Sequence, residues 1–206
     1  MTIEIAALEP SAPALDRLLD AWRALFVASE CTCFCHYWHF EGTKNDWLMR
    51  CATSPETNAE EHAARVRAND PSARGLLAIE RGEPGEDAPL NAVGWMKLAP
   101  RATLPKLTRQ GAYRLVNLGD SEGVWSIGCL LVQPEHRGRR VAHALVAAAA
   151  TQVRAWGGRA VEGYPHRAEY RLHPEEACRG PEALFRACGF VPVHDVGPYP
   201  VYRHDL

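Results

Sequence analysis

The chain has 206 residues, of which 47% are hydrophobic and 23% are charged, and its formal net charge at pH 7 is −2. Such a chain can bury a core as one domain, and its near-neutral charge gives no general attraction to nucleic acid. No apolar run approaches the roughly 20 residues that cross a bilayer, and the first residues lack the layout of a signal peptide. Seven cysteines, an odd number, fit a reducing compartment. We therefore expect a cytoplasmic protein without a membrane or nucleic-acid partner.

Strands and helices alternate along the chain. Alternating or continuous apolar runs predict strands, and apolar residues at helical spacing predict helices. In chain order we predict a strand at 2–6, helices at 13–28 and 58–68, strands at 76–79 and 91–98 joined by an acidic turn at 82–89, a strand at 124–132, a helix at 138–156, a strand at 159–164, a helix at 181–188, and strands at 190–193 and 201–203. Thr57 and Glu60 are expected to form a capping box for the second helix. Residues 99–122 are basic and show no clear pattern.

A basic loop, Arg-Gly-Arg-Arg at 137–140, connects the strand at 124–132 to the long helix. A helix N-terminus carries unpaired N–H groups and a partial positive charge, which suit a pyrophosphate. Short basic runs are usually solvated surface. The flanking strand and helix favour an anion site in this case. The strand at 159–164 follows the helix and is expected to run parallel to 124–132.

Several segments in a fixed order resemble the GNAT superfamily of N-acetyltransferases, and in particular a bacterial branch of it. The loop resembles the family's acyl-CoA pyrophosphate pattern, Arg/Gln-x-x-Gly-x-Gly/Ala, with Arg140 where Gly is usual. The other matching segments are Trp-Ser-Ile-Gly-Cys in strand 124–132, Val-Glu-Gly-Tyr-Pro at 161–165, Phe-Arg-Ala-Cys-Gly-Phe at 185–190, and Cys-Phe-Cys-His-Tyr-Trp at 33–38.

This resemblance implies a fold of the α/β (α+β) class. We expect a mixed, mostly antiparallel central sheet with a splayed parallel strand pair and helices on both faces. Residues 1–206 would form a single acyl-CoA-binding domain, with 29–57 as an insertion that shapes the acceptor site. The last strands often pair between subunits in the family, so a homodimer is possible.

The resemblance also implies where acetyl-CoA, the acyl donor, would bind. It would wedge between strands 124–132 and 159–164, and the backbone of Leu130, Leu131 and Val132 would pair with the pantetheine arm. The amides of the loop and helix start would hold the pyrophosphate; these residues are Arg137, Gly138, Arg139, Arg140, Val141 and Ala142. An arginine at position 140 either hinders the close approach that glycine allows or turns outward and adds a charged contact.

Acetyl transfer to an amine needs a neutral amine, a polarised thioester carbonyl and a proton for the leaving thiolate. Many family members supply that proton from a tyrosine in the last helix, where this chain has Phe185. We therefore take Tyr164 as the candidate acid and Glu162 as the candidate base. The alternatives are that Glu162 is an ordinary ion-pair residue and Tyr164 a packing ring. Cys129 invites an acyl-cysteine intermediate, but direct attack is the family norm.

The segment at 31–40 holds three cysteines and two histidines, which suggests zinc. Alternate cysteines on an extended segment all point one way, and no distant second ligand pair accompanies them, so we expect no metal. We interpret the segment as an aromatic wall over the acceptor. The predicted substrate-binding residues are Cys35, Tyr37, Trp38 and Trp125.

The leading hypothesis is therefore an acetyl-CoA-dependent N-acetyltransferase acting on the primary amine of a small molecule or peptide. A second is a CoA-binding sensor or scaffold of the same fold without transfer activity, which the departures at Arg140 and Phe185 keep open. A third is a metal- or redox-responsive protein that uses the cysteine cluster.

Overall fold

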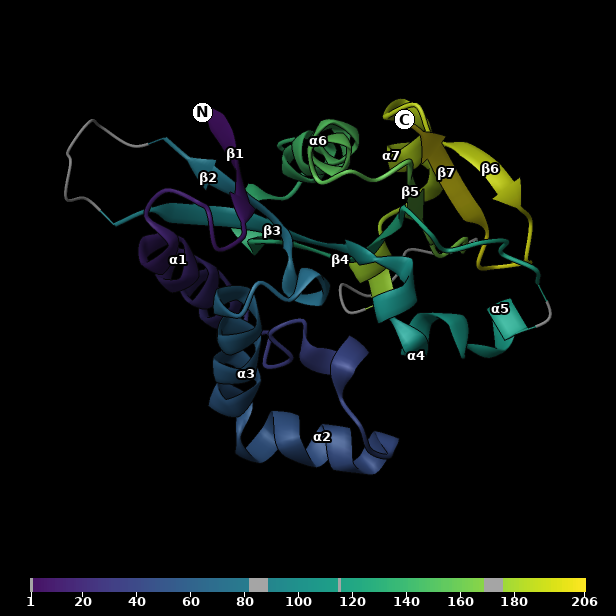
Figure 1. The fold of residues 1–206 in the computed structure, drawn as a ribbon. Coiled ribbons are helices and arrows are strands. Elements are labelled where there is room, and N and C mark those ends of the chain that lie inside the picture. Colours follow the sequence, from purple (N-terminus) through teal and green to yellow (C-terminus); the bar gives the residue numbers. More distant parts are fainter. Residues whose placement is uncertain (1, 82–88, 115, 169–175) are drawn as a thin grey trace.

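The computed structural model describes residues 2–81, 89–114, 116–168 and 176–206. Its centre is one seven-stranded sheet in the order β1-β2-β3-β4-β5-β7-β6. Neighbouring strands are antiparallel except for β4 and β5, which are parallel. The predicted fold class, a mostly antiparallel sheet with one parallel pair and helices on both faces, is confirmed (Figure 1).

The strands are β1 (Ile3–Leu8), β2 (Gly75–Glu80), β3 (Asn91–Pro100), β4 (Val124–Val132), β5 (Ala160–Gly163), β6 (Val191–His194) and β7 (Val201–Asp205). The α-helices are α1 (Leu15–Ala28), α2 (Lys44–Thr53), α3 (Pro55–Arg67), α4 (Pro105–Thr108), α5 (Gly111–Arg114), α6 (Val141–Ala155) and α7 (Glu182–Ala187). Short 3₁₀ turns lie at η1 (His36–His39), η2 (Pro71–Ala73), η3 (Arg101–Thr103), η4 (Pro134–His136) and η5 (Glu176–Arg179).

Helices cover the two faces of the sheet because successive strand residues point to opposite sides. In β3, Trp95 packs toward α1, whereas Met96 packs toward α6. Helices α6 and α7 lie over one face, and α1 and α3 lie below the other (Figure 1). A third apolar cluster, which includes Trp38 and Tyr164, lies beside α4 and α5 on the side of the sheet opposite α6.

The first helical hairpin departs from the sequence prediction. Helix α2 was not expected, and the only residue it buries is Trp47. The predicted capping box at Thr57 and Glu60 is wrong, because α3 already begins at Pro55. A capping box exists instead at the start of α2, where Thr43 and Asp46 exchange backbone and side-chain hydrogen bonds. The mostly polar sequence of α2 gives little helical periodicity.

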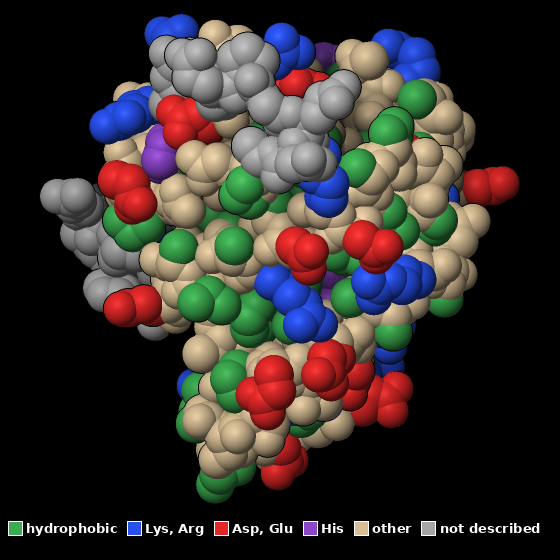
Figure 2. All heavy atoms as spheres, turned by 90° about the vertical axis from the view of Figure 1, so that its left-hand side faces the viewer, with side chains coloured by type: hydrophobic (Ala, Val, Ile, Leu, Met, Phe, Trp, Pro, Cys, Tyr) green, Lys and Arg blue, Asp and Glu red, His purple; other side chains and the backbone are tan. Residues whose placement is uncertain are grey.

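Two further expectations concern the cysteine segment and the acidic turn. The cysteine segment is not extended: Phe34 and Cys35 have φ angles of 43° and 53°, so the chain turns there and the side chains of Cys31, Cys33 and Cys35 do not form one row. The predicted acidic turn at 82–89 lies outside the described residues except for its last position. On the face shown in Figure 2, several acidic side chains gather over the lower part, where Figure 1 places α2 and α3.

Strand β5 is held under α7 by a close approach at Gly163. A Cβ atom at this position would lie 2.1 Å from Cε1 of Phe185, whose side chain is fully buried. Glycine therefore lets the phenyl ring sit directly on the β5 backbone. The contact fixes α7 over the end of the strand that borders the candidate site.

We predict that Gly163→Ala lowers the free energy of unfolding by about 1–3 kcal/mol, because the added methyl group overpacks the Phe185 ring. Chemical denaturation measures the loss. In the double variant with Phe185→Leu the two losses should be less than additive, since the smaller side chain makes room for the methyl group. Strictly additive losses would contradict the proposed contact.

Candidate active site

The candidate site begins where β4 and β5 part. The two strands pair only from Val124 to Ser126, opposite Ala160 to Glu162. On its other side β4 stays paired with β3 as far as Val132. Among the described strands none continues the ladder on the β5 side of β4 beyond Ser126. The predicted splay is therefore present, and it leaves backbone groups of β4 available for a ligand that adds like a strand.

A β-bulge lies in β4 beside this gap. Lys97 pairs with Cys129 and Leu98 pairs with Ile127, so Gly128 is the extra residue. The Trp38 indole covers it, because a Cβ on Gly128 would lie 3.1 Å from the indole nitrogen. Bulges re-aim backbone groups and often occur next to active sites. A backbone N–H near Leu130, next to the bulge, is our candidate for polarising the thioester carbonyl.

The basic loop leads into the start of α6, and no acidic side chain of this helix occupies that place. No side chain caps the helix, and its first turn holds no acidic residue. The first amides of a helix have no intrahelical acceptor. Arg137, Arg139 and Arg140 are all exposed beside them. The six predicted loop residues thus lie together at one helix start, as an anion site requires.

Arg140 occupies the position where the sequence departs from the family pattern. Its φ and ψ are 63° and 17°, a left-handed conformation. Such a conformation costs an arginine about 1–2 kcal/mol and costs glycine almost nothing. The arginine thus keeps the backbone conformation expected of glycine, and its side chain is exposed. Of the two alternatives raised by the sequence, this geometry favours the outward-facing arginine.

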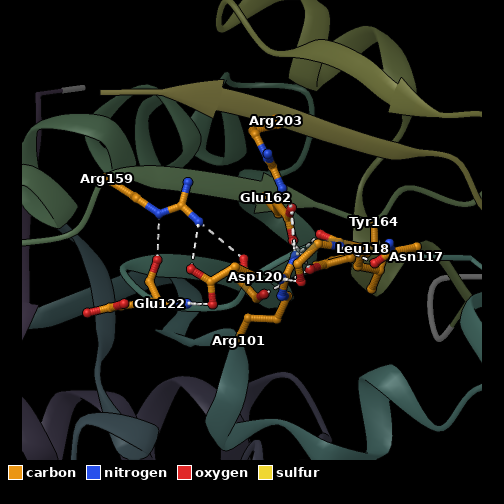
Figure 3. A network of polar contacts seen from close by, with 11 residues as sticks. Arg101, Asn117, Leu118, Asp120, Glu122, Arg159, Glu162, Tyr164 and Arg203 are labelled. Atoms are coloured by element: carbon orange, nitrogen blue, oxygen red, sulfur yellow. Dashed lines mark hydrogen bonds and ion pairs between the residues drawn. The ribbon is translucent and has the colours of Figure 1, made fainter.

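Glu162 is fully buried at the last rung of the β4–β5 pairing, opposite Ser126. Both carboxylate oxygens accept hydrogen bonds from Arg101 at 3.0 Å, and one oxygen also accepts from Arg203 at 2.5 Å. The Tyr164 hydroxyl donates to the other oxygen at 2.5 Å. Figure 3 shows these groups converging on the carboxylate. The sequence placed Glu162 and Tyr164 together correctly, and it gave no signal for the two arginines.

The same network fixes the loop before β4. Arg101 also donates to the carbonyl oxygens of Leu118 and Gly119, at 2.9 and 2.7 Å. Arg159, the residue before β5, donates to the carbonyl oxygen of Glu122 (Figure 3). Two arginines from different elements therefore anchor this loop through its backbone.

Tyr164 is buried, and its hydroxyl lies 2.9 Å from the Ser126 hydroxyl. Burial, followed by the neighbouring Glu162 carboxylate, raises the pKa of Tyr164 well above its ordinary value. At neutral pH the phenol therefore keeps its proton. Its role as an acid, and that of Glu162 as a base, are not tested by this geometry.

Cys129 lies beside the gap, as the sequence indicated. Hydrogen bonds with the Cys178 and Cys35 side chains, together with burial, raise the pKa of its thiol well above the ordinary value. Because the thiolate is the nucleophile, a thiol held in its neutral form agrees with direct transfer and argues against an acyl-cysteine intermediate.

The predicted aromatic wall is only partly assembled. Tyr37 is 40% exposed, and the neighbouring Trp38 backs it with ring centroids 5.6 Å apart. Cys35 is buried and accepts a hydrogen bond from the Trp95 indole at 3.1 Å. Trp125 lies on the opposite face of the sheet, stacked on Trp156 at 4.8 Å. Tyr37 and Trp38 therefore lie together, whereas Trp125 is separated from them by the sheet.

A buried basic cluster lies below Trp38. Lys97 is fully buried and donates to the Ser72 carbonyl oxygen at 2.7 Å, and burial lowers its pKa to about 8. Burial also lowers the pKa of His36 to about 4 and that of His39 to about 3, and it lowers the pKa of the fully buried His62 well below its ordinary value. A lone lysine in the apolar run 91–98 was the available sequence signal for this cluster.

Metal-ligand clusters and membrane-spanning helices are absent from the described ranges. No three His, Cys, Asp or Glu side chains there are grouped so that they could hold a metal ion. None of the described helices is long and apolar enough to cross a membrane. None of the cysteines forms a disulfide within the described ranges.

Comparisons with known proteins agree with this geometry. Residues 44–174, more than half of the chain, match the model of the acetyltransferase (GNAT) family. Solved structures with a similar fold include a protein from Pyrococcus horikoshii OT3, 12% identical over 100% of this chain and 99% of that chain, with a TM-score of 0.51. An aminoglycoside 6'-acetyltransferase type Ii is 14% identical over 100% and 97%, with a TM-score of 0.50. At these identities the likeness shows the fold alone. No curated protein matches the chain.

We predict that acid destabilises the protein steeply below about pH 6.5. His36, His39 and His62 stay neutral in the folded state, because their pKa values are lowered, whereas the unfolded chain binds protons at about pH 6.5. The unfolded state then holds more protons, so the free energy of unfolding falls as pH drops from about 6.5 to 4. Urea unfolding at a series of pH values measures the slope. His39→Gln should reduce that slope; an unchanged slope would contradict the assignment.

We predict that Glu162→Gln lowers the free energy of unfolding by about 3–5 kcal/mol, because it leaves buried Arg101 without its counter-charge. Asp120→Asn is the matched control: Asp120 pairs with Arg159 at 3.5 Å, both groups are more than half exposed, and its loss should cost under about 1 kcal/mol. Equal effects of the two substitutions in denaturation would show that the buried network is unimportant.

Proposed function

The chain belongs to the acetyltransferase (GNAT) family, and from this premise we propose that it transfers the acetyl group of acetyl-CoA to the primary amine of a small molecule or peptide. The amine nitrogen attacks the thioester carbon directly and loses a proton, the C–S bond breaks, and the CoA thiolate takes up a proton. The single observation that carries the proposal is the combination of the uncapped α6 start with the unpaired edge of β4.

The donor fits the residues that are present. The pyrophosphate would lie against the first amides of α6, with Arg137, Arg139 and Arg140 supplying mobile positive charge. The amides of the pantetheine arm would pair with the backbone of Leu130, Leu131 and Val132, which no described strand occupies on that side. The acetyl group would then reach the bulge at Gly128, on the side that Trp38 covers.

The proton-transfer roles are proposed for the end of β5. Glu162 and Tyr164 point to the same side of the sheet as Ser126, toward the α4 and α5 segment. The phenol retains its proton at neutral pH and could give it to the thiolate, with Arg101 close enough to offset the charge left on the oxygen. Glu162 would act on the acceptor ammonium from the same position. The position of the two groups supports these roles, whereas their burial does not.

A second candidate function is a CoA-binding sensor without transfer activity. Phe185 favours it, because this fully buried side chain has no proton to give where many family members carry a tyrosine. The two functions share the donor site and differ only in turnover.

Location and assembly are also proposals. An odd number of cysteines, none of them in a disulfide among the described residues, suits a reducing cytoplasm. A homodimer would most simply use the edge strand β6, where Val191 is 58% exposed. The segment 29–57 would form part of the acceptor site within a single domain.

We predict that the protein binds acetyl-CoA and that Arg137→Glu weakens binding about tenfold, or ~1.4 kcal/mol, because an attractive charge becomes a repulsive one. Calorimetry measures the affinity. Arg154→Glu is the matched control: it makes the same charge change at the exposed far end of α6 and should leave the affinity nearly unchanged.

Thiol release from acetyl-CoA across an amine panel separates the two candidate functions. Amine-dependent release supports the transferase, and binding without release supports the sensor. Equal affinity for acetyl-CoA in wild type and Arg137→Glu would overturn the pyrophosphate assignment.

A further inference from the structure

A cavity of about 380 Å³ opens between the start of α2 and the segment of α4. Its lining includes Tyr37 from η1, Lys44 and Trp47 from α2, and Lys106, Arg109 and Gln110 from the α4 segment. The volume lies at the lower end of the range typical of small-molecule sites. A molecule of amino-acid size would occupy it.

The charge of the cavity has one sign. Three of its lining residues, Lys44, Lys106 and Arg109, are cationic, and none of its described lining residues is acidic. None of these three cations forms a salt bridge within the described ranges. Asp46, the carboxylate of α2, accepts hydrogen bonds from the Thr43 N–H and hydroxyl at 2.9 and 2.6 Å and stays ionised, because these bonds lower its pKa. The lining itself carries three cations and no carboxylate among its described residues, so it attracts a compact anion and repels a polycation.

Aromatic rings form the other wall. Tyr37 and Trp47 lie edge to face with centroids 5.5 Å apart, and Trp47 is almost fully buried. The Lys106 ammonium lies 4.5 Å from the centroid of Tyr37 and 5.0 Å from that of Phe40. These cation–π contacts hold the lysine at the edge of the cavity without neutralising its charge.

Two series of residue contacts link the cavity to the proposed transfer point. Tyr37 leads to Trp38, which covers the bulge at Gly128. On the other side, Gln110 accepts a hydrogen bond from Arg179 at 2.7 Å, and the next residue, Gly180, lies against Leu130. The Trp38 side chain therefore lies between the cavity and the bulge on one side, and Arg179 and Gly180 lie between the cavity and Leu130 on the other.

We propose that this cavity binds the carboxylate of the acceptor, so that the substrate is a small primary amine that carries a carboxylate. This inference rests on the proposed function for the fate of the amine. The guanidinium of Arg109 can grip a carboxylate with two hydrogen bonds, and Lys106 adds a point charge. The aromatic wall packs against the carbon skeleton, and the amine extends past Trp38 toward the bulge. An aminoalkyl phosphate has the same chemistry of anion and amine, and the experiment separates it from an amino acid.

The kinetic test measures thiol release from acetyl-CoA with amino acids, the matching amino acid amides, an aminoalkyl phosphate and a polyamine. We expect turnover of amino acids, with KM at least about tenfold higher for their amides. Arg109→Gln combined with Lys106→Met should raise the amino acid KM about tenfold or more and leave the acetyl-CoA KM unchanged. Arg114→Gln, which removes an exposed charge from the same segment outside the cavity, is the matched control and should change neither value.

A binding test keeps the inference separate from the proposed function. Calorimetry with N-acetylphenylalanine, which carries the carboxylate but needs no turnover, should show binding that the double variant weakens about tenfold. No binding at millimolar concentration would overturn the inference, and so would preferred turnover of polyamines or amides. Preferred turnover of the aminoalkyl phosphate would replace the carboxylate with a phosphate and overturn the stated class. Carboxylate binding without any thiol release would refute the transferase and leave the carboxylate site standing.

Discussion

The early parting of β4 from β5 is the constraint around which the site is built. A parallel pair that stayed together would bury the backbone groups of β4 in a ladder and leave none for a ligand. The last paired rung is Ser126 with Glu162, and at this rung the Glu162 carboxylate binds Arg101 and Arg203. The ion-pair network thus holds β5, β7 and the turn after β3 together at the point where the strands separate. Beyond this rung, the Trp38 indole covers Gly128 and η5 lies close to β4, while no described strand pairs with the edge of β4 that faces β5.

Burying so many charges near one point works only because each has partners. A carboxylate without its arginines would be strongly destabilised in this interior, whereas the observed set leaves both of its oxygens hydrogen-bonded. Lys97 and the three histidines solve the same problem differently. Their pKa values are lowered by burial, so the histidines stay uncharged at neutral pH. The interior on the side of the sheet opposite α6 is therefore rich in polar groups, while the α6 side is almost entirely apolar.

Local chemistry explains what the sequence could predict. The bounds predicted for β4 are those observed, and the turn into α6 followed from the loop residues, because both signals lie within a few adjacent positions. The partners of Glu162 could not be found in this way, since Arg101 and Arg203 lie 61 and 41 positions away. The bulge at Gly128 was equally hidden, because a continuous apolar strand reads the same with or without an extra residue. Helix α2 escaped because only Trp47 among its residues is buried.

The acceptor side shows why the missed helix matters. Without α2, the segment 29–57 suggested an aromatic wall over the acceptor and gave no sign of a cationic cavity. With α2 in place, Lys44 faces the same cavity as Lys106 and Arg109, and the rings of Tyr37 and Trp47 become one wall of a cationic site. In the proposed site the rings would supply apolar contact area, while the charges would select the ligand. Specificity in this fold would then come from segments outside the sheet, and the sheet itself would supply only the donor site and the point of transfer.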